Sequence, residues 1–250
     1  MFHLVAFSGA INNTANTQLS LIADQIIQSD SGQAYFQEDM QLQFLYASSA
    51  TLLRSRLVSP KLRQIFIPYL VPFNAALLPA NNPNVVDMRN RPMTLRRLER
   101  FVPEFTSGVA CGTENAYCVM GFSKGLDDAP FGEITTLRAT GTTTQVAGAW
   151  TDVALTFDQQ LADGRYAIIG GQFQSTTAIA WRLILSNQVW RPGGLGQAAL
   201  GSRTHDMYYN GRLGNWGEFV NTNLPRLQVL SNAADTAQNL FLQVVRVGEN

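Results

Sequence analysis

The chain has 250 residues, 46% of them hydrophobic and 14% charged, so it can bury one large core or two small ones and is too apolar to remain disordered. Its 18 basic residues balance its 18 acidic residues, and neither end carries a run of like charge. This excludes the basic arm with which many proteins neutralise nucleic-acid phosphates. The start lacks the positive region of a secretory signal, and no stretch approaches the ~20 apolar residues of a membrane span. We therefore expect a soluble protein made in the cytoplasm.

The first half of the chain is predicted to form short strands separated by turns. Met40–Tyr46 alternates apolar and polar residues, which is typical of a strand. Ile65–Phe73 is rich in β-formers but holds two prolines, so we expect an edge strand or an extended loop. Met93–Val102 is the best helix candidate, because its apolar residues recur at loosely helical intervals. On that helix three arginines form a solvated face: Arg96, Arg97 and Arg100.

The second half gives cleaner signals. Residues 125–144 are rich in Gly and Thr and are expected to link two domains. Trp150–Phe157 then alternates, and further strand-sized runs follow at intervals of roughly 8 to 12 residues, which indicates an antiparallel sandwich or barrel. Alternating strands and long helices are missing, so an α/β enzyme fold is not expected.

A distorted copy of one pattern occurs in each half. Three pairs of short segments match, namely Gln43-Phe44 with Gln172-Phe173, Asp87-Met88 with Asp206-Met207, and Asn115 with Asn239. The offsets within the pairs are 129, 119 and 124 residues, a period that suits a whole small domain rather than a solenoid repeat. The sequence therefore predicts an all-β chain of two tandem antiparallel β-sandwich or jelly-roll domains. They are an N-terminal domain at 1–124 and a C-terminal domain at 145–250, joined by a linker at 125–144.

A glycine-rich stretch could be mistaken for a nucleotide site. Gly194, Gly196 and Ala199 match the G-x-G-x-x-A pattern, and Glu218 lies at about the distance of a ribose-binding acid. That motif works only where a strand feeds a helix, and here Pro192 precedes it and the following residues end any helix within two turns. A glycine-rich loop is favoured.

Nucleophilic and redox chemistry have few candidates. The histidines are His3 and His205. His205 adjoins Asp206, but neighbours on a strand point to opposite faces, so a surface histidine is favoured over a catalytic pair. Cys111 and Cys118 are seven residues apart, a spacing that also points them to opposite faces of a strand. Buried free thiols are therefore favoured over a disulfide.

Two polar segments are expected to be plain loops. Asp127, Asp128 and Glu133 could offer oxygens to calcium but lack the spacing of an EF-hand, so a solvated interdomain loop is favoured. Asn210–Phe219 contains successive turn signals and predicts a protruding or clamped loop without chemistry.

Sugar chemistry is the remaining possibility. Glycosidases need two carboxylates across the sugar, and no local arrangement of acids singles out a pair. The tryptophans could stack on a sugar. Trp150, Trp181, Trp190 and Trp216 are the candidates. Trp181 lies in an apolar strand and is expected in the core, whereas Trp190 and Trp216 lie near turns and are better candidates. Packing between domains is the favoured role for Trp190 and Trp216.

Two tandem β-sandwich domains at this offset, with neither a catalytic cluster nor a basic arm, resemble the double jelly-roll major capsid proteins of icosahedral viruses and phages. The resemblance covers nearly the whole chain and lies in architecture and repeat length. It implies two jelly-roll barrels side by side, a homotrimer with a pseudo-hexagonal outline, and trimers that tile into the shell of a virion made in the host cytoplasm. Such shells often enclose an internal membrane. The implied partners are other copies of the chain, other virion proteins and that membrane, without direct nucleic-acid binding.

No catalytic, cofactor-binding or metal-ligating residue is predicted, and the chain is not expected to be an enzyme. Two other classes stay open. A carbohydrate-binding or carbohydrate-cleaving β-sandwich requires an exposed aromatic platform, and a phage decoration or tail component has the same fold at a different copy number. If the internal repeat is real, residues 20–122 should superpose on 145–247 with most strands aligned.

Overall fold

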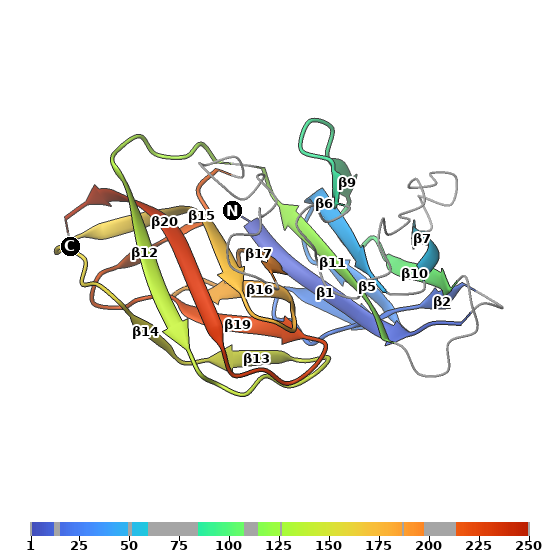
Figure 1. The fold of residues 1–250 in the computed structure, drawn as a ribbon. Coiled ribbons are helices and arrows are strands. Elements are labelled where there is room, and N and C mark those ends of the chain that lie inside the picture. The colour runs from blue at the N-terminus through green and yellow to red at the C-terminus, as the bar shows by residue number, and fades with distance from the viewer. Residues whose placement is uncertain are drawn as a thin grey trace. The chain divides into compact units, whose positions relative to one another are not determined.

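A computed structural model describes residues 2–12, 16–49, 52–59, 85–107, 115–125, 127–186, 188–197 and 214–249 (Figure 1). In these residues every regular element is a β-strand. The described part of the chain also contains no helix long and apolar enough to cross a membrane. The residues fall into two compact units. The N-terminal unit runs from Val5 to Lys124, and the C-terminal unit joins Phe2–Leu4 to the residues from Gly125 onward.

The N-terminal unit has two sheets and a hairpin. One sheet has the order β3-β1-β11-β6-β8, with β9 also paired to β6, the other has the order β2-β10-β7, and β4 pairs with β5. The strands are β1 (Phe2–Ala10), β2 (Thr17–Gln18), β3 (Ser20–Leu21), β4 (Ile27–Asp30), β5 (Gln33–Phe36), β6 (Met40–Ser48), β7 (Leu52–Val58), β8 (Val85–Asp87), β9 (Met93–Leu95), β10 (Val102–Ser107) and β11 (Asn115–Ser123).

The C-terminal unit has the strand path β13-β19-β16-β17-β15-β20-β12-β14, with β18 also paired to β15. Its two layers are joined at one edge, where β17 pairs with β15 in parallel over two residues and with β16 in antiparallel. The strands are β12 (Ile134–Gly141), β13 (Trp150–Val153), β14 (Leu155–Phe157), β15 (Arg165–Gln174), β16 (Ala178–Ile184), β17 (Gly193–Gln197), β18 (Gly217–Val220), β19 (Arg226–Ser231) and β20 (Gln238–Gly248).

Both units use the same strand order. In the C-terminal unit the first, eighth, third and sixth main strands form one layer (β12, β20, β15, β18), and the second, seventh, fourth and fifth form the other (β13, β19, β16, β17). In the N-terminal unit β1, β11, β6 and β8 take the places of the first layer, and β2, β10 and β7 those of the second. These seven strands are the ones that the described residues of the N-terminal unit assign to this order. This order is that of a jelly roll, so the predicted fold class is confirmed.

Large apolar side chains from both layers fill each core. In the N-terminal unit Phe36 lies 4.8 Å from Phe122 and 5.9 Å from Phe101 between ring centroids, and Phe7 lies 6.0 Å from Phe101. All four rings are at most 2% exposed. Rings at these separations stabilise one another beyond the burial of their area, so this phenylalanine cluster fixes the distance between the two layers.

The helix predicted at Met93–Val102 is wrong. Met93–Leu95 forms β9 and pairs with Met40–Leu42 of β6, and after a turn the chain enters β10 at Val102. The apolar residues of the segment do not share a face, because Leu98 is 51% exposed and Phe101 is fully buried. Pairing with a strand fifty residues earlier overrides the weak local periodicity.

The segment expected as a linker, 125–144, contains β12, which pairs with β20 from Ile134 to Gly141. Threonine, which suggested a loop, is β-branched and suits a strand. Leu137 and Ala139 of β12 are buried while Thr136 and Arg138 are exposed, as in a half-buried strand. The domain limits at 1–124 and 145–250 stay predictions, as does the edge strand Ile65–Phe73, which lies outside the described residues.

Candidate functional site

The tryptophans do not form an exposed platform. Trp181 and Trp216 are at most 1% exposed and lie 5.9 Å apart between ring centroids, and Trp190 is 8% exposed. Phe2 packs 5.9 Å from Trp216. Trp150 is half-buried, and the Arg182 guanidinium lies 4.1 Å from its ring centroid. The expectation that Trp181 lies in the core is confirmed, and the aromatic platform that sugar binding requires is not formed by these four residues.

The described part of the glycine-rich stretch, Gly193–Gln197, is a strand where a loop was expected. Gly194 and Gly196 lie in β17, whose neighbour β16 passes so close that a Cβ on Gly196 would lie 2.6 Å from the Ala178 carbonyl oxygen. Glycine is therefore required here by backbone approach, and not by a pyrophosphate. Glu218 forms an ion pair with Arg165 (Oε2 to Nε, 3.0 Å). Ala199 lies outside the described residues.

His3 is fully buried. Its Nδ1 accepts a hydrogen bond from the backbone N–H of Arg191 (2.9 Å), and its ring lies edge-on to Trp190 at 6.0 Å. The Leu4 amide donates to the Arg191 carbonyl (2.9 Å). These contacts fasten the first residues of the chain within the C-terminal unit and give His3 a structural role. His205 lies outside the described residues.

The three acids of the expected loop are exposed. The Asp127 backbone carbonyl accepts a hydrogen bond from the Asn215 amide (3.1 Å), so this loop is tied to the end of the Asn210–Phe219 segment. That end is clamped rather than protruding, because the Trp216 amide donates to Ile168 O (2.9 Å) and β18 follows. Within the described ranges no group of three or more His, Cys, Asp or Glu residues could hold a metal ion.

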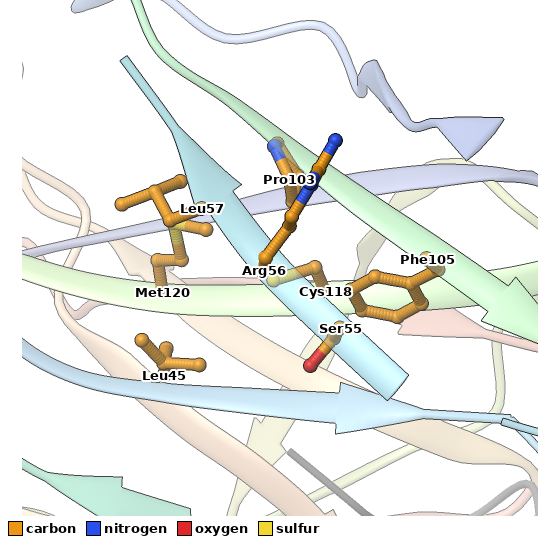
Figure 2. Close-up of a pocket in the computed structure, with 8 residues that line it drawn as sticks. All are labelled: Leu45, Ser55, Arg56, Leu57, Pro103, Phe105, Cys118 and Met120. Carbon is orange, nitrogen blue, oxygen red and sulfur yellow. The ribbon is translucent and has the colours of Figure 1, made fainter. Parts of the chain in front are cut away.

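A small space opens between the layers of the N-terminal unit. It has a volume of about 10 Å³ and is lined by Leu45, Ser55, Arg56, Leu57, Pro103, Phe105, Cys118 and Met120. Figure 2 shows Leu45, Leu57 and Met120 on one side of it and Phe105 with Ser55 on the other. The space is a packing gap of the core and holds no convergent polar groups of the kind that orient a ligand.

Cys118, in the same gap, is a buried free thiol, as predicted. Burial raises the pKa of this thiol well above its ordinary value. The thiolate is the reactive form, so burial disfavours the nucleophilic state of Cys118. Cys111, the other residue predicted to be a buried free thiol, lies outside the described residues.

Gln228 of β19 is half-buried and joins two buried arginines to an exposed aspartate in the C-terminal unit. Its Oε1 accepts hydrogen bonds from Arg182 Nε (2.8 Å) and Arg191 Nη1 (3.3 Å), and its Nε2 donates to Asp152 Oδ1 (2.6 Å). Arg182 is 3% exposed and Arg191 is 7% exposed. The Gln228 amide thus links the Asp152 carboxylate to the Arg182 and Arg191 guanidinium groups. Such a network suits a structural cross-link between strands. Sequence reasoning missed this network, because its members come from four separate strands and loops.

Two exposed segments present large apolar side chains close to charged ones. We call Arg96–Arg100 the basic turn and Asp127–Ile134 the acidic loop. The basic turn exposes Leu98 (51%), and the acidic loop exposes Phe131 (103%) and Ile134 (47%). Exposed apolar residues ringed by charge are typical of surfaces that contact other proteins. Sequence analysis assigned the first segment to a helix and treated the second as a plain loop.

No protein-family model matches the chain, and no curated protein sequence matches it. Among solved structures the chain is similar to the STIV major capsid protein, with 11% identity over 98% of this chain and 97% of that one and a TM-score of 0.27. It is also similar to the major capsid protein P2 of bacteriophage PM2, with 12% identity over 100% of this chain and 99% of that one and a TM-score of 0.24. Both belong to the class that the sequence resembles. Because these TM-scores are low, the fold is assigned from the strand order of this chain.

Proposed function

We propose that the chain is the major capsid protein of a virus and that it assembles as trimers into an icosahedral shell. The observation that carries the proposal is the strand order, which occurs once in each unit of a single chain. Three such chains supply six similar barrels, so a trimer has an approximately six-fold outline. Units of that outline tile a curved surface, as the subunits of a closed shell must.

The surface properties of the chain fit this role. A shell protein needs large self-complementary surfaces rather than a ligand pocket. Its zero formal charge suits a coat that does not contact the genome directly, since phosphate contacts require cations. Location in the virion, contacts with other virion proteins and contact with an internal membrane belong to the same proposal.

The test is the mass of the purified full-length chain, measured by size-exclusion chromatography with light scattering across a range of concentration, salt and pH. The chain weighs 27.5 kDa, so a trimer weighs three times as much, 82.5 kDa. A trimer or a larger closed particle supports the proposal. A 27.5 kDa monomer under every condition would contradict it.

The other two classes make different predictions. A sugar-binding protein would stack its ligand on an exposed aromatic ring, and the burial of Trp181, Trp190 and Trp216 removes the residues on which that alternative was based. A decoration or tail component would share the fold and differ in number of copies. Quantifying the chain against the other proteins of a purified particle separates the two, because a shell protein is the most abundant.

A further inference from the structure

The basic turn holds a leucine where the backbone favours glycine. The Glu99 amide donates to Arg96 O (2.9 Å), which closes a four-residue turn with Leu98 in its third place, and Leu98 has a φ of 61°. Glycine or asparagine normally occupies a turn position with positive φ, because a Cβ is strained there. The leucine is also 51% exposed. Two unfavourable features, strain and apolar exposure, thus coincide at one residue.

Three arginines and three acids lie around Leu98, and one guanidinium among them is left without an acidic partner in the described part of the chain. Glu99 is buried and accepts hydrogen bonds from Arg96 N (2.9 Å) and Ser59 Oγ (2.6 Å). Arg96 Nη1 lies 2.9 Å from Asp39 Oδ2, and Arg100 forms an ion pair with Asp30. Arg97 is exposed, and its side chain has no acidic partner among the residues that the structure describes. The turn therefore presents an apolar side chain next to an unneutralised guanidinium.

The acidic loop has the opposite charge and the same kind of apolar exposure. From Gly125 to Leu137 the sequence contains three acids and no lysine or arginine. Phe131 is fully exposed, and its neighbour Gly132 packs so closely that a Cβ there would lie 2.6 Å from Val245 Cγ1 of β20. The backbone beside Phe131 is thus held against the sheet while the ring points into solvent.

We propose that the basic turn of one copy binds the acidic loop of a neighbouring copy. Arg97 would face Asp128 and Glu133, and Leu98 would pack against Phe131. This inference rests on the proposed self-assembly and names the surfaces that carry it. Because the contact joins two different segments of the chain, it can repeat head-to-tail from copy to copy, and head-to-tail contacts generate a ring when the rotation closes. The proposal includes closure at three copies, which is the trimer proposed above.

The experiment exchanges the charges. Arg97→Glu and Asp128→Arg are made singly and together in the full-length chain, and the concentration at which half of the protein is trimeric is measured by sedimentation velocity. Each single reversal places like charges across the contact. Because a closed trimer repeats that contact three times, the half-point concentration should rise by about tenfold or more. The double variant restores opposite charges and should return to within about threefold of the wild type.

Matched controls change the same charge elsewhere. Arg226→Glu and Glu249→Arg alter exposed residues outside both segments and should leave the half-point concentration within about twofold, as expected for solvent-exposed charges that take no part in the contact. Phe131→Ser tests the apolar half of the contact. Since the ring is fully exposed, the substitution should leave the thermal unfolding midpoint of the dissociated chain unchanged while raising the half-point concentration.

The outcomes separate this inference from the proposed function. Weakened single variants with a restored double variant support the contact. A trimeric wild type whose single reversals behave like the controls overturns the contact, assigns these segments to another partner and leaves self-assembly standing. Weakened single variants without restoration overturn the pairing of the two segments. A wild type that stays monomeric overturns the proposed function, and the contact with it.

Discussion

In the N-terminal unit phenylalanines fill the space between the layers, whereas in the C-terminal unit that space is occupied by Trp181, Trp216 and Phe173. The C-terminal unit also buries two arginines. Both units nevertheless have one strand order. The comparison shows that a jelly roll constrains which positions face inward and leaves open how the interior is filled.

The tryptophans make this comparison measurable. All four lie in the C-terminal unit, at positions 150, 181, 190 and 216. Tryptophan fluorescence therefore reports the unfolding of the C-terminal unit alone, while far-ultraviolet circular dichroism reports the strands of both units. Comparing the two signals therefore separates the unfolding of the N-terminal unit from that of the C-terminal unit.

The largest effect is expected from Phe101→Ala. Phe101 is fully buried and contacts the rings of Phe7, Phe36 and Phe122. Truncating a buried phenylalanine costs about 3–5 kcal/mol. In urea the circular dichroism transition should begin at lower concentration while the tryptophan transition stays in place. If both transitions shift together, the two units unfold as one cooperative body and the comparison of separate interiors fails.

Gly193→Ala is the counterpart in the C-terminal unit. A Cβ on Gly193 would lie 2.0 Å from the Trp181 carbonyl oxygen, which belongs to the backbone of the paired strand β16 and cannot move aside. Overpacking of this kind costs about 3 kcal/mol, and tryptophan fluorescence should show the loss. Gly248→Ala is the matched control, because its Cβ would meet no atom closer than 3.5 Å. Equal effects from the two variants would contradict the close approach of β17 and β16.

The internal repeat could be predicted from the sequence because two of its matching segment pairs lie in long strands, and each of these strands has a recognisable apolar pattern. Gln43-Phe44 lies in β6 and Gln172-Phe173 in β15, the third strands of their units. Asn115 and Asn239 lie in β11 and β20, the eighth strands. Those central strands are apolar over most of their length, and periodicity detects such segments best.

The failures have long-range causes. Met93–Leu95 became a strand through pairing with β6, which no local window contains. For Trp190 and Trp216 packing was the favoured role, but the sequence did not identify their ring partners, His3 and Phe2, which come from the other end of the chain. The candidate contact surfaces were missed for a different reason. The exposure of Leu98 and Phe131 follows from backbone geometry, and composition alone does not distinguish an exposed apolar residue from a buried one.

Gln228→Leu tests how much the polar network, which the N-terminal phenylalanine cluster does without, contributes to the stability of the C-terminal unit. The substitution keeps the volume of the side chain but leaves Arg182 and Arg191 without the acceptor they share. An unsatisfied buried donor costs about 1–3 kcal/mol. Denaturation followed by tryptophan fluorescence measures the loss. Gln159→Leu removes an exposed hydrogen bond to Thr136 O and should cost less than about 0.5 kcal/mol. If both variants are equally stable, the network does not hold the unit together.

The smallest effect concerns Asp235, in the loop before β20. Its Oδ2 accepts hydrogen bonds from Ser175 Oγ (2.6 Å), Thr176 N (2.9 Å) and Thr176 Oγ1 (2.9 Å). Its Oδ1 accepts from Thr236 N (2.7 Å) and Ala237 N (3.1 Å). Partial burial acts to raise the pKa of Asp235, but these hydrogen bonds outweigh it and lower the pKa from 3.8 to about 2. The charged carboxylate therefore ties the loop to the turn between β15 and β16.

Because the folded-state pKa of Asp235 lies below its ordinary value, the stabilisation is complete above pH 3.8 and is lost as the pH falls toward 2. After allowance for its partial exposure to solvent, the contribution is about 1–2 kcal/mol. Asp235→Asn should therefore be less stable than the wild type at pH 7 by about this amount, and the difference should vanish near pH 2. Urea unfolding followed by tryptophan fluorescence between pH 7 and pH 2 measures both free energies. A gap that stays constant down to pH 2 would show that the charge of Asp235 does not hold the loop, and that the variant is weakened by lost packing instead.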